Sequence, residues 1–172
     1  MNLRYLVKQL GLLLLVLSGI LLTLVIVFYV IEALLHHDVN PAARWAVFVS
    51  GLVGVLMGTG LWMLAGKPSR HLGRREALLL VAASWLLGAA FAALPYLLWA
   101  HWPGTDAAPD HPFRNFVDCY FEAMSGLTTT GATVLSDIES IPESLLLWRA
   151  TTHWLGGLGI VVLFVLLLMQ LV

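Results

Sequence analysis

Long apolar runs separated by short polar connections make up most of the chain. The first run, residues 10–33, predicts a membrane helix over about residues 8–35, since about 20 apolar residues are enough to cross a bilayer core of about 30 Å. Three further runs predict helices over about 45–65, 77–99 and 145–172. We therefore expect an all-α integral membrane protein with four transmembrane helices.

One stretch between the last two runs breaks this pattern, FVDCYFEAMSGLTTTGAT at residues 116–133. It is too polar to cross a bilayer. Residues 116–126 are amphipathic and predict a short helix, with Asn115 as its N-cap. Irregular backbone at membrane depth is tolerated only where protein buries it or where it lines a water-filled cavity. The pattern therefore predicts a re-entrant unit, in which a short pore helix enters and an extended strand over residues 128–133 returns.

The returning segment has the chemistry of a cation path. Threonine hydroxyls and backbone carbonyls are hard oxygen ligands, and residues 128–133 contain no charged side chain. Gly131 can turn a carbonyl inward because it adopts positive φ without a Cβ clash. From these residues alone, a glycine-containing turn between a surface helix and a membrane helix is an equally good interpretation.

The run FEAMSGLTTTGAT, followed by LLLWRATTHWLGGLGIVVL, resembles the Trk/Ktr/HKT superfamily of potassium transporters, and most closely its bacterial TrkH-type branch. The resemblance covers about the last 60 residues. It implies a potassium-channel-like helix, pore loop and helix, with Gly131 as the filter glycine and potassium held by backbone oxygens of Thr129, Thr130 and Gly131. The implied selectivity filter is Thr128, Thr129, Thr130, Gly131 and Ala132.

Two charged residues flank this segment at membrane depth. Glu122 lies on the short helix, where a carboxylate is costly unless it is paired or hydrogen-bonded. It could accept backbone or threonine hydrogen bonds from behind the filter, a role that the resemblance favours, or it could be exposed in an outer vestibule. Arg149, near the start of the last helix, could support the loop or extend outward to the membrane surface.

Charge and composition restrict the function classes. The 172 residues are 60% hydrophobic and 11% charged, with a net charge of -1, which excludes an ordinary soluble domain and gives no electrostatic case for nucleic-acid binding. The basic segment at 66–76, with Lys67, Arg70, Arg74 and Arg75, predicts a cytoplasmic loop and hence a cytoplasmic N-terminus in the inner membrane. We divide the chain into residues 1–76, two leading helices and this loop, and residues 77–172, the first helix, pore loop and helix repeat.

Other patterns predict packing. Ser50, Gly54 and Gly58 recur every fourth residue and would allow close helix contact in lipid. Pro95 should kink or end the third helix. Tyr96, Trp99 and Trp102 fit an interfacial aromatic belt.

The superfamily builds one pore from four such repeats, and this chain contains one. We expect it to be the N-terminal part of a longer transporter, with association of four copies as the alternative. The resemblance implies contact with membrane lipid, a homodimer and a cytosolic nucleotide-binding regulatory subunit. Coupling of potassium transport to sodium or protons stays an open question. No resident cofactor and no catalytic residue are predicted.

Two other functions stay open at this point. The chain could be a small assembly or regulatory subunit without transport activity. A membrane-embedded hydrolase would need a nucleophile and a base, but Ser125 has no base at an evident spacing. His153 has no orienting carboxylate nearby in sequence, and many members of the superfamily have glutamine at its position.

Overall fold

A computed structural model describes residues 3–35, 40–66 and 74–169. These residues form helices and contain no β-strand. The elements in chain order are α1 (Leu3–Leu35), α2 (Pro41–Ala65), α3 (Arg74–Ala92), α4 (Leu94–His101), the 3₁₀ turn η1 (Pro112–Arg114), α5 (Phe116–Leu127) and α6 (Glu143–Met169). The side chains of most of the basic segment, the histidine pair at 36–37 and the last three residues lie outside the described part.

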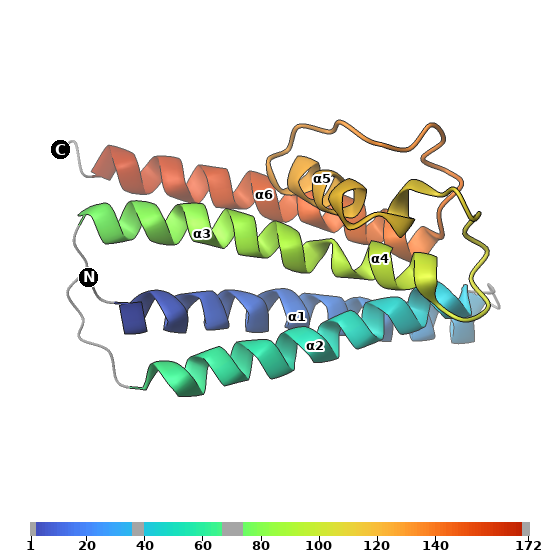
Figure 1. Ribbon diagram of the computed structural model, residues 1–172, viewed down its shortest axis with the longest axis horizontal. Helices are drawn as coiled ribbons and strands as arrows, with labels where there is room; N and C mark the ends of the chain where they lie inside the picture. The colour runs from blue at the N-terminus through green and yellow to red at the C-terminus, as the bar shows by residue number, and fades with distance from the viewer. Residues whose placement is uncertain (1–2, 36–39, 67–73, 170–172) are drawn as a thin grey trace.

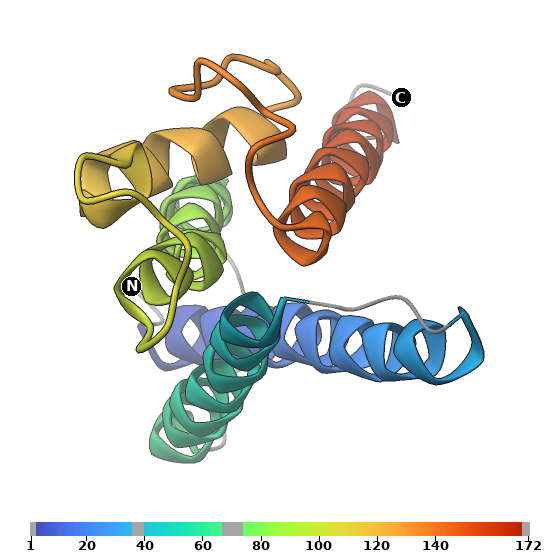
Figure 2. The ribbon, with the colours of Figure 1, turned by 90° about the vertical axis from the view of Figure 1, so that its right-hand side faces the viewer.

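The helices are arranged in layers (Figures 1 and 2). Helices α1 and α2 lie together on one side, α3 and α4 lie above them, and α6 and the short helix α5, with the loop that joins them, lie on the side away from α1 and α2. Three spans are long and apolar enough to cross a membrane, at Leu3–Leu34, Pro41–Ala65 and Arg75–His101. The three apolar spans and the helices of the described residues indicate an all-helical membrane protein.

Small residues set the contact between α1 and α2, as the spacing of Ser50, Gly54 and Gly58 predicts. A β-carbon on Gly58 would lie 2.8 Å from the carbonyl oxygen of Gly11, and one on Gly54 would collide with the Ser18 hydroxyl. Glycine therefore allows the two backbones to approach closely, because no side chain separates them.

Helix α2 begins four residues before its expected start. Asn40 is its N-cap and accepts a hydrogen bond from the Ala43 amide at 3.0 Å, with Pro41 in the first turn. The Asn40 side chain also donates to Asp106 at 3.1 Å, in the segment after α4. At the same end of the pair, Glu32 forms an ion pair with Arg44.

Pro95 interrupts the third span, as expected. Helix α3 ends at Ala92 and α4 begins at Leu94, since proline cannot donate to a preceding carbonyl. The expectation of an aromatic belt is wrong for Tyr96 and Trp99, which are 0% and 1% exposed and lie in the core. The break lets α4 pack its aromatic side chains against Phe113 of η1.

Candidate functional site: the loop between α5 and α6

Helix α5 forms where the amphipathic pattern predicts it. The Asn115 side chain caps it by accepting from the Val117 amide at 3.0 Å, and Asp118 lies in the first turn, where the helix dipole favours an anion. The lone cysteine, Cys119, is buried and donates through Sγ to the Phe113 carbonyl. One face of α5 is therefore packed against the protein, and its C-terminus is fixed in position.

A tight turn follows α5 at Thr128 and Thr129, where the sequence predicts the start of an extended strand, and residues 130–133 form neither helix nor strand. The amides of Thr129 and Thr130 donate to the carbonyls of Gly126 and Ser125, each at 2.9 Å. Gly131 has φ 78°, as its predicted role requires, and Thr129 also has a positive φ of 57°. The side chains of the predicted filter segment, residues 128–132, are exposed.

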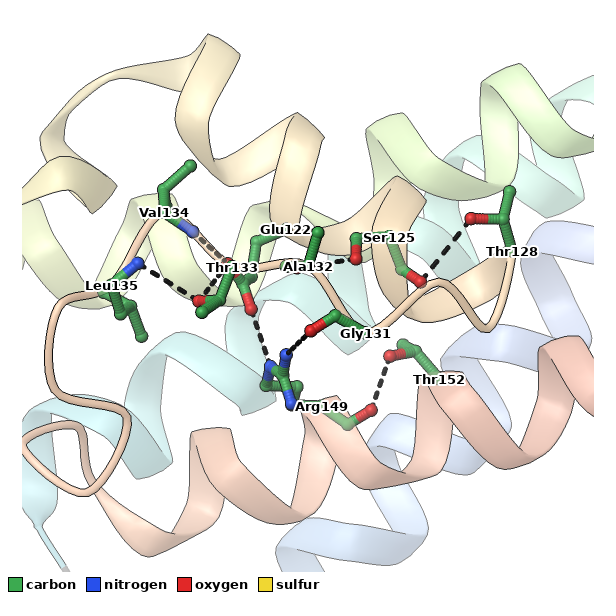
Figure 3. Close-up of polar contacts among 10 residues, drawn as sticks. All are labelled: Glu122, Ser125, Thr128, Gly131, Ala132, Thr133, Val134, Leu135, Arg149 and Thr152. Atoms are coloured by element: carbon green, nitrogen blue, oxygen red, sulfur yellow. Dashed lines mark hydrogen bonds and ion pairs between the residues drawn. The ribbon is translucent and has the colours of Figure 1, made fainter.

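Two carbonyls of the loop accept hydrogen bonds from side chains of α5 and α6 (Figure 3). The Ser125 hydroxyl donates to the Ala132 carbonyl at 2.6 Å, and Arg149 Nη2 donates to the Gly131 carbonyl at 3.4 Å. Among the described residues, no donor reaches the carbonyls of Thr129 or Thr130.

Glu122 lies behind the loop and is 1% exposed. Its carboxylate accepts from the Thr133 hydroxyl at 2.8 Å, the Val134 amide at 3.1 Å and Arg149 Nε at 2.6 Å. A buried carboxylate is costly without such partners, and here three donors satisfy it (Figure 3). Glu122 and Arg149, the two predicted supports, are thus in direct contact with each other and with the loop.

The side of α6 that faces the loop carries small and polar residues. A β-carbon on Gly156 would collide with the Leu127 carbonyl oxygen at the end of α5. Thr152 and His153 lie against Gly126. Gly156 of the WLGG motif therefore allows α6 to approach the backbone at the end of α5 directly.

The sequence anticipated a threonine or backbone hydrogen bond to Glu122 as one of two possibilities, and Thr133 and Val134 supply it. The contact of Ser125 was not predicted, because its hydroxyl donates to a carbonyl seven positions away and a lone hydroxyl residue gives no sequence signal for such a partner. In the part of the chain that the structure describes, no group of three or more His, Cys, Asp or Glu side chains could hold a metal ion.

Comparisons with known proteins agree with this architecture. A family model described as "TrkH: Cation transport protein" matches residues 43–172. The Trk system potassium uptake protein TrkH of Halomonas elongata is 40% identical over 98% of this chain, and its namesake in Escherichia coli K12 is 33% identical over 98%. The crystal structure of the potassium transporter TrkH from Vibrio parahaemolyticus aligns over 98% of this chain with a TM-score of 0.79 and 29% identity.

The alignments cover only part of these relatives. This chain spans 31% of the length of the two TrkH sequences and 32% of the solved chain. The family model nevertheless includes α5, the loop and α6 within its matched residues. The chain thus belongs to the TrkH family of cation transport proteins.

Proposed function

We propose that this chain contributes one part of a pore for potassium uptake, with residues 128–133 as its ion-selective segment. The observation that carries the proposal is the Glu122 carboxylate, buried behind the loop and bonded at once to Thr133, Val134 and Arg149. These bonds to a buried carboxylate hold residues 128–133 in one conformation. The names of the relatives, potassium uptake proteins, supply the ion.

The loop supports the proposal through its oxygen chemistry. Thr129 and Thr130 present carbonyls that no described residue binds, at exposed positions next to a glycine of positive φ. A potassium ion that loses its hydration shell needs several such oxygens around it. One loop offers oxygens from one side, so the site is complete only when further repeats, in the same polypeptide or in other copies, close the ring. Gly131 would contribute its carbonyl by sharing it between the ion and Arg149.

The same proposal fixes the topology. Helix α6 would be the fourth transmembrane helix and α5 a re-entrant pore helix that enters from the outer face. Residues 1–76 would form the two leading helices and their cytoplasmic loop, and residues 77–172 the helix, pore loop and helix repeat. The N-terminus would be cytoplasmic in the inner membrane, by the distribution of basic residues between the loops.

The remaining assignments follow the family and are proposals of the same kind. They are contact with membrane lipid, a homodimer, a cytosolic nucleotide-binding regulatory subunit, and sodium or proton coupling of the transported potassium. We assign no enzymatic activity. The hydroxyl of Ser125, a conceivable nucleophile, donates to the Ala132 carbonyl and so has a structural partner.

Potassium uptake tests the function. The natural polypeptide that carries these residues would be expressed in cells without their own potassium uptake systems, and compared with its Gly131→Ser variant. Gly104→Ser is the matched control, because Gly104 also has a positive φ, 79°, but lies in the connection between α4 and η1. We expect the first substitution to abolish selective uptake and the control to retain it at equal membrane expression. Uptake that is unaffected by Gly131→Ser would refute the proposed filter.

A further inference from the structure

One polar atom next to the loop has no role in the contacts described so far. His153 lies on α6, one turn after Arg149, and its Nε2 is buried without a hydrogen-bond partner among the described residues. Leaving a buried polar group unpaired costs about 1–3 kcal/mol. Buried polar atoms of this kind are normally satisfied by ordered water when protein offers no partner.

The orientation of the imidazole shows what Nε2 faces. A β-carbon on Gly126 would lie 3.5 Å from His153 Cδ2, and a β-carbon on Gly131 would lie 3.9 Å from Cε1. Both ring carbons are bonded to Nε2, so the nitrogen lies between the end of α5 and the bend of the loop. The ring therefore presents its Nε2 edge to the turn that residues 126–131 form.

The turn itself does not use this nitrogen. Its amides at Thr129, Thr130 and Gly131 donate to the carbonyls of Ser125 and Gly126. The nearby charges, Arg149 and Glu122, are paired with each other. The amides of the turn are already bonded, whereas no described donor reaches the carbonyls of Thr129 and Thr130, so a bridging water molecule fits the place that Nε2 faces best.

We propose that His153 is a positioning residue of the pore loop, which holds a buried water molecule through Nε2 at the turn between Gly126 and Gly131 and thereby keeps the loop in its potassium-selective shape. This inference rests on the proposed function of the loop. The water would link α6 to residues 126–131. This second link would start from α6 one helical turn after Arg149, whose side chain contacts the Gly131 carbonyl. Two supports on α6 would then hold the two sides of the bend.

The test is selectivity of transport in the natural polypeptide. His153→Leu removes the polar edge with little change in volume, whereas His153→Gln keeps a polar group at a similar reach that can donate or accept. His101→Leu is the matched control, since His101 is exposed at the end of α4. We expect the ratio of potassium to sodium uptake to fall about two- to tenfold in His153→Leu, the effect of one net hydrogen bond, and to be retained in the glutamine variant and the control.

The outcomes separate this inference from the proposed function. Uptake that depends on Gly131 but keeps its ion ratio in His153→Leu would overturn the role of His153 alone. A loss of ion ratio in both His153 variants would also overturn it, because a polar group that can hold a water molecule would then not be the feature that matters. Uptake that is independent of Gly131 would overturn the proposed function itself. A high-resolution structure of the natural polypeptide should show a water molecule on Nε2, and a protein atom in that place would contradict the proposal.

Discussion

The carboxylate of Glu122 accepts a hydrogen bond from Nε of Arg149 at 2.6 Å, across 27 residues of sequence. The pair joins α5 to α6, and each partner also binds the loop between them, Glu122 through Thr133 and Val134 and Arg149 through the Gly131 carbonyl. The Glu122 side chain is fully buried and that of Arg149 is 16% exposed. The loop is therefore held by one ion pair from two sides.

Breaking this pair should destabilise the protein more than removing it. Glu122→Ala leaves Arg149 without its partner, and we expect a loss of about 3 kcal/mol in stability, the lower end of the range for buried pairs because Arg149 is partly exposed. The double variant Glu122→Ala with Arg149→Ala should lose less stability than Glu122→Ala alone, and less than the sum of the two single alanine variants. Thermal unfolding of the purified natural polypeptide in detergent measures both, and strictly additive losses would show that the pair does not act as a unit.

The hydroxyl of Ser125 should matter for ion flux. It donates to the Ala132 carbonyl at 2.6 Å, so Ser125→Ala frees that carbonyl and removes about 1 kcal/mol of support from the loop. We expect weaker discrimination between potassium and sodium in uptake assays. Ser140→Ala is the control, because the Ser140 hydroxyl donates to Asp137 in the exposed connection before α6. Equal effects of the two substitutions would argue against a specific role for Ser125.

A methyl group at Gly156 should separate α6 from the end of α5. A β-carbon there would collide with the Leu127 carbonyl oxygen, whereas one on Gly60 of α2 meets no atom within 4 Å. Overpacking of this kind costs about 1–3 kcal/mol, so Gly156→Ala should lower the melting temperature and reduce potassium uptake. Gly60→Ala should be neutral or slightly stabilising, since alanine is the better helix former. Full activity of Gly156→Ala would contradict the close approach of α6 to α5.

Acid should weaken the connection that precedes α5. His111 Nδ1 accepts a hydrogen bond from the Phe113 amide at 3.1 Å, and burial together with the nearby Arg114 lowers the pKa of His111 below its usual 6.5. A lowered pKa in the folded state means that the contribution is present above about pH 6.5 and is lost as the pH falls through the folded value. The melting temperature should therefore fall when the pH is lowered below about 6.5.

The His111→Asn variant tests this effect. Asparagine keeps an acceptor close to the position of Nδ1 but does not titrate, so the dependence of the melting temperature on pH should become flatter below about pH 6.5. His101→Asn, at an exposed histidine, controls for a general effect of removing a titratable group. An identical pH dependence in His111→Asn and the parent protein would assign the transition to other groups.

The sequence predicts those parts of the site that local chemistry determines. Helix α5 and its Asn115 cap follow from amphipathic spacing and from a side-chain acceptor at the first turn. The positive φ of Gly131 follows from the residue type. The start of α2 at Asn40 and Pro41 had the same kind of local signal, but the prediction placed these residues in the connection.

Contacts that depend on tertiary docking could not be predicted in the same way. Whether Arg149 reached the loop or the membrane surface depended on how α6 packs on α5. The predicted aromatic belt is wrong because the break before Pro95 places Tyr96 and Trp99 in the core. The positive φ of Thr129 likewise results from the backbone bonds that close the turn. None of these has a sequence signature.

The most direct test of the central claim is the reversal potential of the purified natural polypeptide in a planar bilayer, with potassium on one side and sodium on the other. If residues 128–133 form the selective segment, the parent protein should show a potential close to that of a potassium-selective membrane, and Gly131→Ser should move it toward zero while current persists. The Gly104→Ser control should keep the parent value. A potassium-selective potential that Gly131→Ser leaves unchanged would contradict the assignment of this loop as the filter.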